Sequence, residues 1–252
     1  MKKDIVIGLG EIGFPIYRII SKVFPTYGYD KNTDLLPKTN KKFEFHSTRF
    51  LHVCIPYNKN FVFNVIKLNK KFLPDAIVIH STIKPGTTGN IQKKLSIPVI
   101  YSATRGVHKR MLSDLKKYTK FFAFDKTVPN SIVSSRLYTQ LMKKSGIKTK
   151  KMSNTVTLEL SKIICDTSYY GWLINYAQIS KIITDKFSVD YDEMWSFSDE
   201  IHKFLGNRPK LFPGFIGGHC VIPNLELLNV NSLSQINKIN NIFKKFLETK
   251  TL

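Results

Sequence analysis

The stretch Asp4-Ile-Val-Ile-Gly8-Leu-Gly10-Glu-Ile-Gly13-Phe-Pro15 decides the fold of this 252-residue chain. Residues 4–8 predict a short buried strand, and apolar residues at helical spacing follow the last glycine. The glycines between them have the spacing Gly-x-Gly-x-x-Gly. In this context Gly8 permits a tight turn, Gly10 lets the backbone approach a pyrophosphate, and Gly13 lets the helix pack close to the strand. We therefore predict a Rossmann-type domain that binds a dinucleotide.

An acidic residue downstream indicates which dinucleotide is bound. Residues 26–30 predict a second strand that ends in Asp30, 20 residues after Gly10. A carboxylate there accepts hydrogen bonds from the adenosine ribose and repels a 2′-phosphate, which favours NAD although Lys31 stands beside it. The alternative is a glycine-rich turn without a ligand and a chance acid. The residues predicted to contact NAD are Gly8, Gly10, Glu11, Ile12, Gly13, Asp30, Lys31, Pro56, Ser81 and Thr82.

Short apolar stretches alternate with helical stretches over the first part of the chain. This alternation is typical of βαβ units with a parallel sheet. We expect an α/β fold in which residues 1–150 form the Rossmann-type parallel-sheet domain. The further strands are predicted at 50–56, 76–80, 99–102 and 121–124, and a helix at 60–72.

The pattern becomes helical near residue 152. Residues 154–186 hold no proline and one glycine, and predict one long central helix or two helices that break near Gly171. We expect residues 151–252 to form an α-helical domain around it. The remaining predicted elements are a helix at 191–205, a Pro/Gly-rich loop at 207–223, and a helix at 233–247 with Ile236, Ile239, Ile242, Phe243 and Phe246 on one face.

Composition excludes several classes of protein. The apolar fraction of 42% is that of a globular protein, and no apolar run approaches the ~20 residues that span a bilayer. Asp4 and Glu11 interrupt the apolar start, so we predict no signal peptide and a cytoplasmic location. Cys54, Cys165 and Cys220 lie far apart without a CxxC pair, so neither a disulfide framework nor a metal site is predicted.

The formal net charge of +21 is compatible with nucleic acid, an anionic membrane surface or phosphorylated ligands. The lysines are scattered, however, and Lys, Asn and Ile are all abundant, which equally indicates a biased composition. The sequence has no RNP-type, zinc-finger or helix-turn-helix signature. We therefore predict a small-molecule partner rather than nucleic acid or a membrane.

Three segments carry candidate chemistry. Gly217-Gly218-His219-Cys220 would let a thiol project into a cleft as a nucleophile, or it is a tight loop with a structural cysteine. Glu159, Lys162 and Asp166 stand at i, i+3 and i+7 and would share a helical face, where the lysine could stabilise an oxyanion; a solvated charge pair is the alternative. Residues 81–88, Ser-Thr-Ile-Lys-Pro-Gly-Thr-Thr, follow a strand where α/β sheets bind ligands, or form a simple capping turn.

The glycine-rich stretch and these three segments resemble, in their order along the chain, motifs of the UDP-glucose/GDP-mannose dehydrogenase family. The resemblance extends over essentially the whole chain. Residues 8–15 resemble the family's GLGxxGxP, residues 81–88 its STxxPGTT, residues 159–162 its ExxK, and residues 217–223 its GGHCxP. The resemblance is to a short form, because the family's second Rossmann-like domain, which supplies much of the nucleotide-sugar site, would begin near residue 252.

The resemblance implies a mechanism like that of UDP-glucose 6-dehydrogenase. NAD-dependent oxidation of an alcohol gives an aldehyde, which the cysteine captures as a thiohemiacetal. A second oxidation gives a thioester, and water releases the acid. By position, Cys220 would be the nucleophile, Lys162 would stabilise the oxyanion and Thr82 would position substrate or water.

The sequence also departs from the family pattern. Asp166 stands where the family has Asn, and Asn224 where it has Asp, so the amide and the carboxylate are exchanged; both stay candidate catalytic residues. Residues 103–105, Ala-Thr-Arg, replace Pro-Glu-Arg, which removes a general-base candidate for thioester hydrolysis. His108 is a candidate substitute.

Three interpretations stay open. The first is an NAD-dependent dehydrogenase of a sugar, phosphorylated sugar or nucleotide sugar, working as a homodimer through the helix at 154–186. The second is a two-electron enzyme resembling the hydroxyacid dehydrogenases, which also combine a Rossmann domain, a helical domain and a helix lysine. The third is a non-catalytic, regulatory NAD-binding module.

Overall fold

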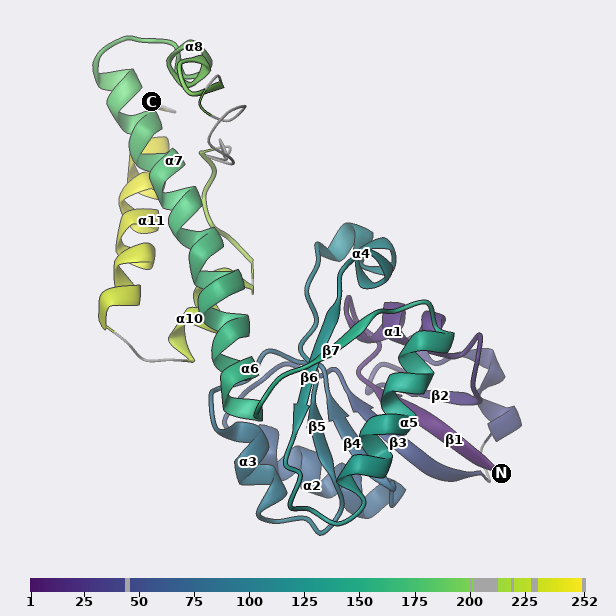
Figure 1. The fold of residues 1–252 in the computed structure, drawn as a ribbon. Coiled ribbons are helices and arrows are strands. Elements are labelled where there is room, and N and C mark those ends of the chain that lie inside the picture. The colour runs from purple at the N-terminus through teal and green to yellow at the C-terminus, as the bar shows by residue number, and fades with distance from the viewer. Residues whose placement is uncertain (44–45, 200, 202–212, 219, 228–230, 251–252) are drawn as a thin grey trace. The chain divides into compact units, whose positions relative to one another are not determined.

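The computed structural model describes residues 1–43, 46–199, 201, 213–218, 220–227 and 231–250. The described chain divides into two compact units, Met1–Lys162 and Ile163–Leu252 (Figure 1). A functional domain boundary at residue 150 stays a prediction. Each unit is described by itself below.

A seven-stranded sheet forms the centre of the first unit, as predicted for a Rossmann-type domain. All neighbouring strands pair in parallel except β5 and β6, which pair antiparallel. Because β2 lies on one side of β1 and β3 on the other, the strand order reverses beside β1, where such sheets bind ligands. In spatial order the strands are β2 (Thr26–Tyr29), β1 (Lys2–Ile7), β3 (Ser47–Val53), β4 (Ala76–Ile79), β5 (Val99–Tyr101), β6 (Lys120–Phe124) and β7 (Thr149–Lys151).

Six of the strands lie where the sequence predicted them, and β7 was not predicted. The helices that complete the unit are α1 (Gly13–Ile20), α2 (Phe61–Phe72), α3 (Thr87–Gln92), α4 (Met111–Lys117), α5 (Ser131–Lys144) and α6 (Thr155–Ser161). Short 3-10 turns cover Thr33–Leu35, Lys38–Phe43 and His108–Arg110.

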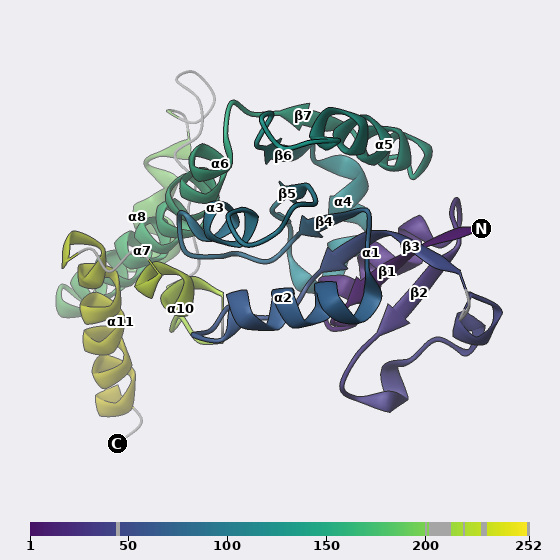
Figure 2. The same ribbon diagram turned by 90° about the horizontal axis from the view of Figure 1, so that it is seen from below.

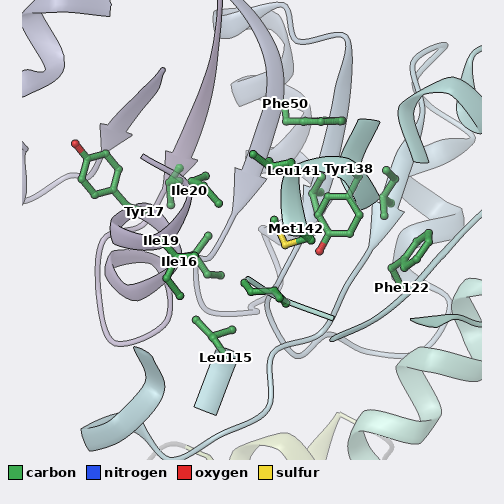
Figure 3. Close-up of a cluster of buried hydrophobic side chains, with 14 of the residues drawn as sticks. Ile16, Tyr17, Ile19, Ile20, Phe50, Leu115, Phe122, Tyr138, Leu141 and Met142 are labelled. Carbon is green, nitrogen blue, oxygen red and sulfur yellow. The ribbon is translucent and has the colours of Figure 1, made fainter. Parts of the chain in front are cut away.

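Apolar side chains cover both faces of the sheet. Alternate strand residues such as Val6 and Phe50 pack against α1, α4 and α5, whereas Ile5 and Leu51 pack against α2 and α3 on the opposite face. Figure 2 shows α2 and α5 on opposite sides of the strands. The first of these clusters gathers Ile16, Tyr17, Ile19, Ile20, Phe50, Leu115, Phe122, Tyr138, Leu141 and Met142 (Figure 3).

Helix α1 begins in direct contact with the turn that follows β1. A Cβ atom on Gly13 would lie 1.7 Å from the carbonyl oxygen of Gly8 and 3.1 Å from the Cβ of Cys54. Gly8 itself has φ of +83°, a conformation that glycine adopts without strain. The backbone of α1 therefore approaches the sheet more closely than any other residue type at position 13 would allow.

The second unit is helical, as predicted. A π-helical segment, Lys162–Ser168, follows α6 directly and leads into α7 (Tyr169–Lys186), so the chain is helical from 155 to 186 without the break considered at Gly171. A Cβ atom on Gly171 would lie 3.2 Å from Val221 and 3.3 Å from Ile236, so this glycine marks close packing. The remaining helices are α8 (Tyr191–Ser196), α10 (Val221–Glu226) and α11 (Asn231–Lys250).

Two predictions for the second unit were wrong. The loop predicted at 207–223 gives way to α10 at Val221, because Pro223 sits in the first turn of that helix, where proline is tolerated. Ile242 is 59% exposed, whereas Ile236 and Phe243 are buried, so Ile242 lies off the packed face of α11. The predicted helix at 191–205 holds α8, but residues 200 and 202–205 lie outside the described residues, as does the beginning of the predicted loop.

Within the described residues, no helix is both long enough and apolar enough to cross a bilayer.

The close approach of α1 predicts opposite effects for two glycine substitutions. Gly13→Ala should lower the free energy of unfolding by more than about 2 kcal/mol, because the new methyl group overlaps a carbonyl oxygen. Gly89→Ala, inside α3, meets no described atom within 4 Å and should raise it by about 0.5–1 kcal/mol through helix propensity. Urea unfolding without added ligand measures both, and equal stability of the two variants would contradict the packing described.

Candidate active site

The glycine-rich turn lies where the strand order reverses. Gly8 directly follows β1, Gly13 begins α1, and Ile12 precedes the helix as its N-cap residue without a capping side chain. The space around a Cβ atom built on Gly10 is open, since no described atom lies within 4 Å of it. The turn therefore leaves room at Gly10 for a group that approaches the backbone.

Asp30 is tied to this turn, at the end of β2. One carboxylate oxygen accepts a hydrogen bond from the backbone N–H of Leu9 at 2.6 Å, and the other accepts one from Asn32 at 2.9 Å. Each carboxylate oxygen has a further lone pair, so Asp30 can still accept hydrogen bonds from a ribose. Lys31 beside it is exposed.

The ends of the next two strands meet beside the turn. Pro56 follows β3, and Ser81 and Thr82 follow β4. The buried Ser81 hydroxyl donates a 2.6 Å hydrogen bond to the carbonyl oxygen of Ile55 and so joins the two strand ends. Thr82 is half-buried. The structure thus gathers the predicted cofactor residues 8–13, 30–31, 56 and 81–82 at one edge of the sheet.

Glu159 fixes the turn after β4 to the helix that carries Lys162. Its fully buried carboxylate accepts hydrogen bonds from the backbone N–H of Gly86 at 2.5 Å and of Thr88 at 2.9 Å, and from the Thr88 hydroxyl at 2.6 Å. Burial raises the pKa of this carboxyl, and the three hydrogen bonds oppose the rise. The alternative of a solvated Glu159 is therefore wrong.

Lys162 stands at the end of α6 and begins the π-helical segment. Because that segment lacks α-helical periodicity, the predicted common face of Glu159, Lys162 and Asp166 is not formed by α-helical spacing. Lys162 and Asp166 are both half-buried.

A lysine that the sequence analysis missed lies near this edge. The buried Lys120 ammonium donates to the carbonyl oxygens of Ser102 at 3.0 Å and Ala103 at 3.3 Å, and to the Thr104 hydroxyl at 3.0 Å. Burial lowers its pKa to about 7, and the positive charges of Lys162 and Arg105 contribute to this shift. Lys120 therefore fixes the segment that contains Thr104, the position at which the resemblance predicted a glutamate.

A band of buried polar groups crosses the sheet from this segment. His80 Nδ1 lies 3.1 Å from the Ser102 carbonyl, which only accepts, so His80 Nε2 must accept from His52 Nδ1 at 2.9 Å. Burial holds the pKa of His80 well below its usual range, so that ring is neutral. At the far end, Arg49 binds the buried Asp4 carboxylate through two hydrogen bonds, at 2.9 and 2.6 Å.

His108, the candidate substitute for the missing glutamate, lies elsewhere. Its Nδ1 is 2.7 Å from a carboxylate oxygen of Glu11, in the glycine-rich turn. The two side chains are 26% and 53% exposed, so the pair sits at the surface beside the predicted pyrophosphate position. This contact places His108 with the cofactor turn.

In the second unit, buried amides hold the segment that precedes Cys220. Asn240 on α11 accepts a hydrogen bond from the Ile216 backbone N–H at 2.8 Å and donates one to the Ile216 carbonyl at 3.1 Å. Gln178 on α7 donates to the Gly214 carbonyl at 2.7 Å and to Asn240 at 3.1 Å. Figure 1 shows α7 and α11 side by side, which lets their amides reach the same segment. The backbone before Cys220 is therefore fixed by both helices.

Cys220 is an exposed residue that directly precedes α10, and Asn224 lies half-buried in that helix. Ile216 and Leu225, on either side of the cysteine in sequence, both pack in a core with Ile163 and Ile236. Gly218 has φ of +72° with open space at its Cβ position, so the chain turns there without strain. His219 lies outside the described residues.

The other two cysteines differ from Cys220. Burial raises the pKa of the Cys54 thiol to about 12, so it is protonated at neutral pH. Cys165 is exposed on the π-helical segment. No group of three or more His, Cys, Asp or Glu among the described residues is arranged to hold a metal ion.

Comparison with known proteins concerns the fold. No family model and no curated protein matches the sequence. Among solved structures, UDP-D-ManNAc dehydrogenase from Pyrococcus horikoshii is similar with a TM-score of 0.78 and 18% identity, over 97% of this chain and 69% of that one. UDP-N-acetyl-mannosamine dehydrogenase from Staphylococcus aureus gives 0.75 and 16%, over 100% and 70%.

A shorter dehydrogenase is similar as well. The 3-hydroxyisobutyrate dehydrogenase from Mycobacterium tuberculosis gives a TM-score of 0.65 and 13% identity, over 97% of this chain and 93% of that one. At such identities the similarity establishes the fold: along essentially its whole length, this chain has the fold of the nucleotide-sugar dehydrogenases.

Proposed function

We propose that this chain is an NAD-dependent dehydrogenase that oxidises the alcohol of a sugar or a nucleotide-activated sugar. The observation that carries the proposal is the set of hydrogen bonds that the Glu159 carboxylate accepts from Gly86 and Thr88. They hold the helix that carries Lys162 against the turn after β4, at the same sheet edge as the glycine-rich turn. This attachment supports a role for the Lys162 ammonium at the edge where a dinucleotide would bind.

The residues present fit NAD. Gly10 leaves open space for the pyrophosphate, and Asp30 retains acceptor capacity for the ribose. The amino-terminal end of α1 adds the positive end of its dipole. When bound, NAD supplies the hydride acceptor. Ser81 and Thr82, at the end of β4, would lie on the nicotinamide side.

The chain's own residues would handle the substrate. Lys162 would stabilise the oxyanion that develops when the alcohol loses its proton. Cys220 would add to the resulting aldehyde, its sulfur bonding to the carbonyl carbon, which allows a second oxidation to a thioester and release of the acid by water. Asp166 and Asn224 would supply one carboxylate and one amide to the reaction, and Thr82 would orient substrate or water.

A two-electron dehydrogenase is the second candidate. It is favoured by the similarity to 3-hydroxyisobutyrate dehydrogenase, which extends over 93% of that chain. Such an enzyme stops at the carbonyl and needs Lys162 but no cysteine. A non-catalytic NAD-binding module would need neither side chain, and a cytoplasmic location stays a prediction in every case.

Helix α7 presents an apolar surface that suits a homodimer. Exposed side chains of α7, and of Phe187 directly after it, recur three or four residues apart. We call them the α7 stripe: Tyr169, Trp172, Tyr176, Ile179, Ile183 and Phe187, which are 37–70% exposed. Such spacing keeps side chains on one side of a helix. Pairing of two α7 stripes would remove them from water.

The open space at Gly10 predicts a variant that folds but binds NAD poorly. Gly10→Val should weaken binding at least about tenfold, or about 1.4 kcal/mol, because its side chain fills the space proposed for the pyrophosphate. Its thermal unfolding without ligand should match that of the unmodified chain. Calorimetric titration with NAD, with Gly89→Ala as control, measures this, and undiminished affinity of Gly10→Val would refute the cofactor assignment.

The proposed nucleophile predicts a change in product. Cys220→Ser should lower the rate of acid formation by roughly three orders of magnitude or more, because a serine hydroxyl is not ionised at neutral pH. Cys165→Ser, at the other exposed cysteine, should leave the rate unchanged. Product analysis with a series of nucleotide sugars, counting NADH per molecule oxidised, distinguishes the candidates. A single NADH and a carbonyl product from both variants would favour the two-electron enzyme.

The α7 stripe predicts the oligomeric state. The unmodified chain should sediment as a dimer at micromolar concentration, and Ile179→Asp/Ile183→Asp should sediment as a monomer, because charges cannot be buried unpaired in the contact. Ile242→Asp on α11, an exposed isoleucine outside the stripe, is the matched control and should stay dimeric. Analytical ultracentrifugation decides; a monomeric unmodified chain would rule out the dimer.

A further inference from the structure

A cavity of about 510 Å³ lies in the first unit between the second half of α1, helix α4 and the end of α5. None of the predicted cofactor or catalytic residues lines it. Its volume falls within the range of about 300–1,000 Å³ that is typical of small-molecule sites. The cavity is therefore a candidate binding site separate from the one proposed above.

Four cations surround this cavity. Arg18 lies on α1, and Lys22 lies just after the end of that helix. Lys116 comes from α4, and Lys144 from the last turn of α5. No acidic residue lines the cavity, and no carboxylate among the described residues forms an ion pair with any of the four. Their mutual repulsion is relieved when an anion binds among them.

A buried hydroxyl lacks a partner at the same place. Ser145 lines the cavity with 7% of its surface exposed, and its Oγ has no hydrogen-bond partner in the described structure. Buried polar atoms are normally hydrogen-bonded, and one left without a partner is destabilising. The next residue, Gly146, has φ of +75° and open space at its Cβ position, so no side chain closes the cavity there.

The remaining wall is apolar. Ile19 is 4% exposed and belongs to the buried cluster of Figure 3, and Val23 and Leu112 complete this wall. An inorganic anion would leave that surface uncovered. A ligand with a flat apolar ring system and several negative charges would cover it and neutralise the cations as well.

From this combination we infer that the cavity binds a nucleoside polyphosphate, with the phosphates among Arg18, Lys22, Lys116 and Lys144 and the base against Ile19 and Leu112. Ser145 donates its unpaired hydroxyl hydrogen to the ligand. The inference does not depend on the proposed dehydrogenase activity, because no residue is shared between the two sites.

Calorimetric titration with ATP at physiological salt tests the inference. Lys22→Gln/Lys144→Gln should weaken ATP binding at least tenfold. Lys93→Gln/Lys94→Gln, which removes the same charge from two exposed lysines at α3, is the matched control and should bind as the unmodified chain does. Equal weakening in both double variants would show that overall charge alone attracts ATP, and absence of binding to the unmodified chain would overturn the inference outright.

Two further variants separate the cavity from the NAD site and from a structural effect. Gly10→Val, which blocks the proposed cofactor site, should leave ATP binding unchanged. Loss of ATP binding in this variant would assign the ATP site to the glycine-rich turn instead. Ser145→Ala should weaken ATP binding severalfold while the ligand-free melting temperature stays equal or rises, because the hydroxyl has no partner to lose. A lowered melting temperature in Ser145→Ala would show a structural hydroxyl and contradict its role.

Inorganic tripolyphosphate serves as the last probe, since it carries the charges without the base. It should bind at least tenfold more weakly than ATP. Equal affinity would remove the contribution of Ile19 and Leu112 and overturn the assignment to a nucleoside.

Discussion

The contact between Gly13 and the carbonyl oxygen of Gly8 sets the position of everything at the proposed cofactor site. Because neither residue carries a side chain, α1 starts directly against the turn that follows β1. Asp30 then ties the end of β2 to the same turn through Leu9. Since α1 also supplies Arg18 and Ile19 to the basic cavity, one helix placed by one glycine links the two candidate sites.

Both units fix their candidate chemistry in the same way, through buried polar side chains that bind backbone. In the first unit Glu159 accepts from the turn after β4, and Lys120 donates to the segment after β5. In the second unit Gln178 and Asn240 bind the segment before Cys220. A loop held by several buried hydrogen bonds keeps its geometry without a ligand, which suits residues that must meet a substrate in one orientation.

The sequence predicted the features that depend on local pattern. Apolar runs located six strands, and the spacing of Gly8, Gly10 and Gly13 located the turn. Strand β7 was missed because Thr149–Lys151 is polar and half-exposed at the sheet edge, so it carries no apolar signal. Ile242 was assigned to the buried face by residue type, whereas Asn240 occupies that face to bind a loop distant in sequence. Lys120 escaped notice among 39 Lys and Arg residues because only the fold buries it.

The polar band across the sheet has a consequence for folding. Four neighbouring strands each supply one polar group to this band: Asp4 lies on β1 and His52 on β3, while His80 directly follows β4 and Ser102 directly follows β5. Neighbouring groups in the band contact each other only when the strands have the observed register. A one-residue slip between any two of these strands would turn a charged or imidazole group toward the opposite, apolar face. Parallel strands rich in valine and isoleucine tolerate such slips easily, since one aliphatic side chain replaces another at little loss. The buried histidines and the Asp4–Arg49 pair make misaligned sheets unstable, and so select a single pairing from many that hydrophobicity alone would accept.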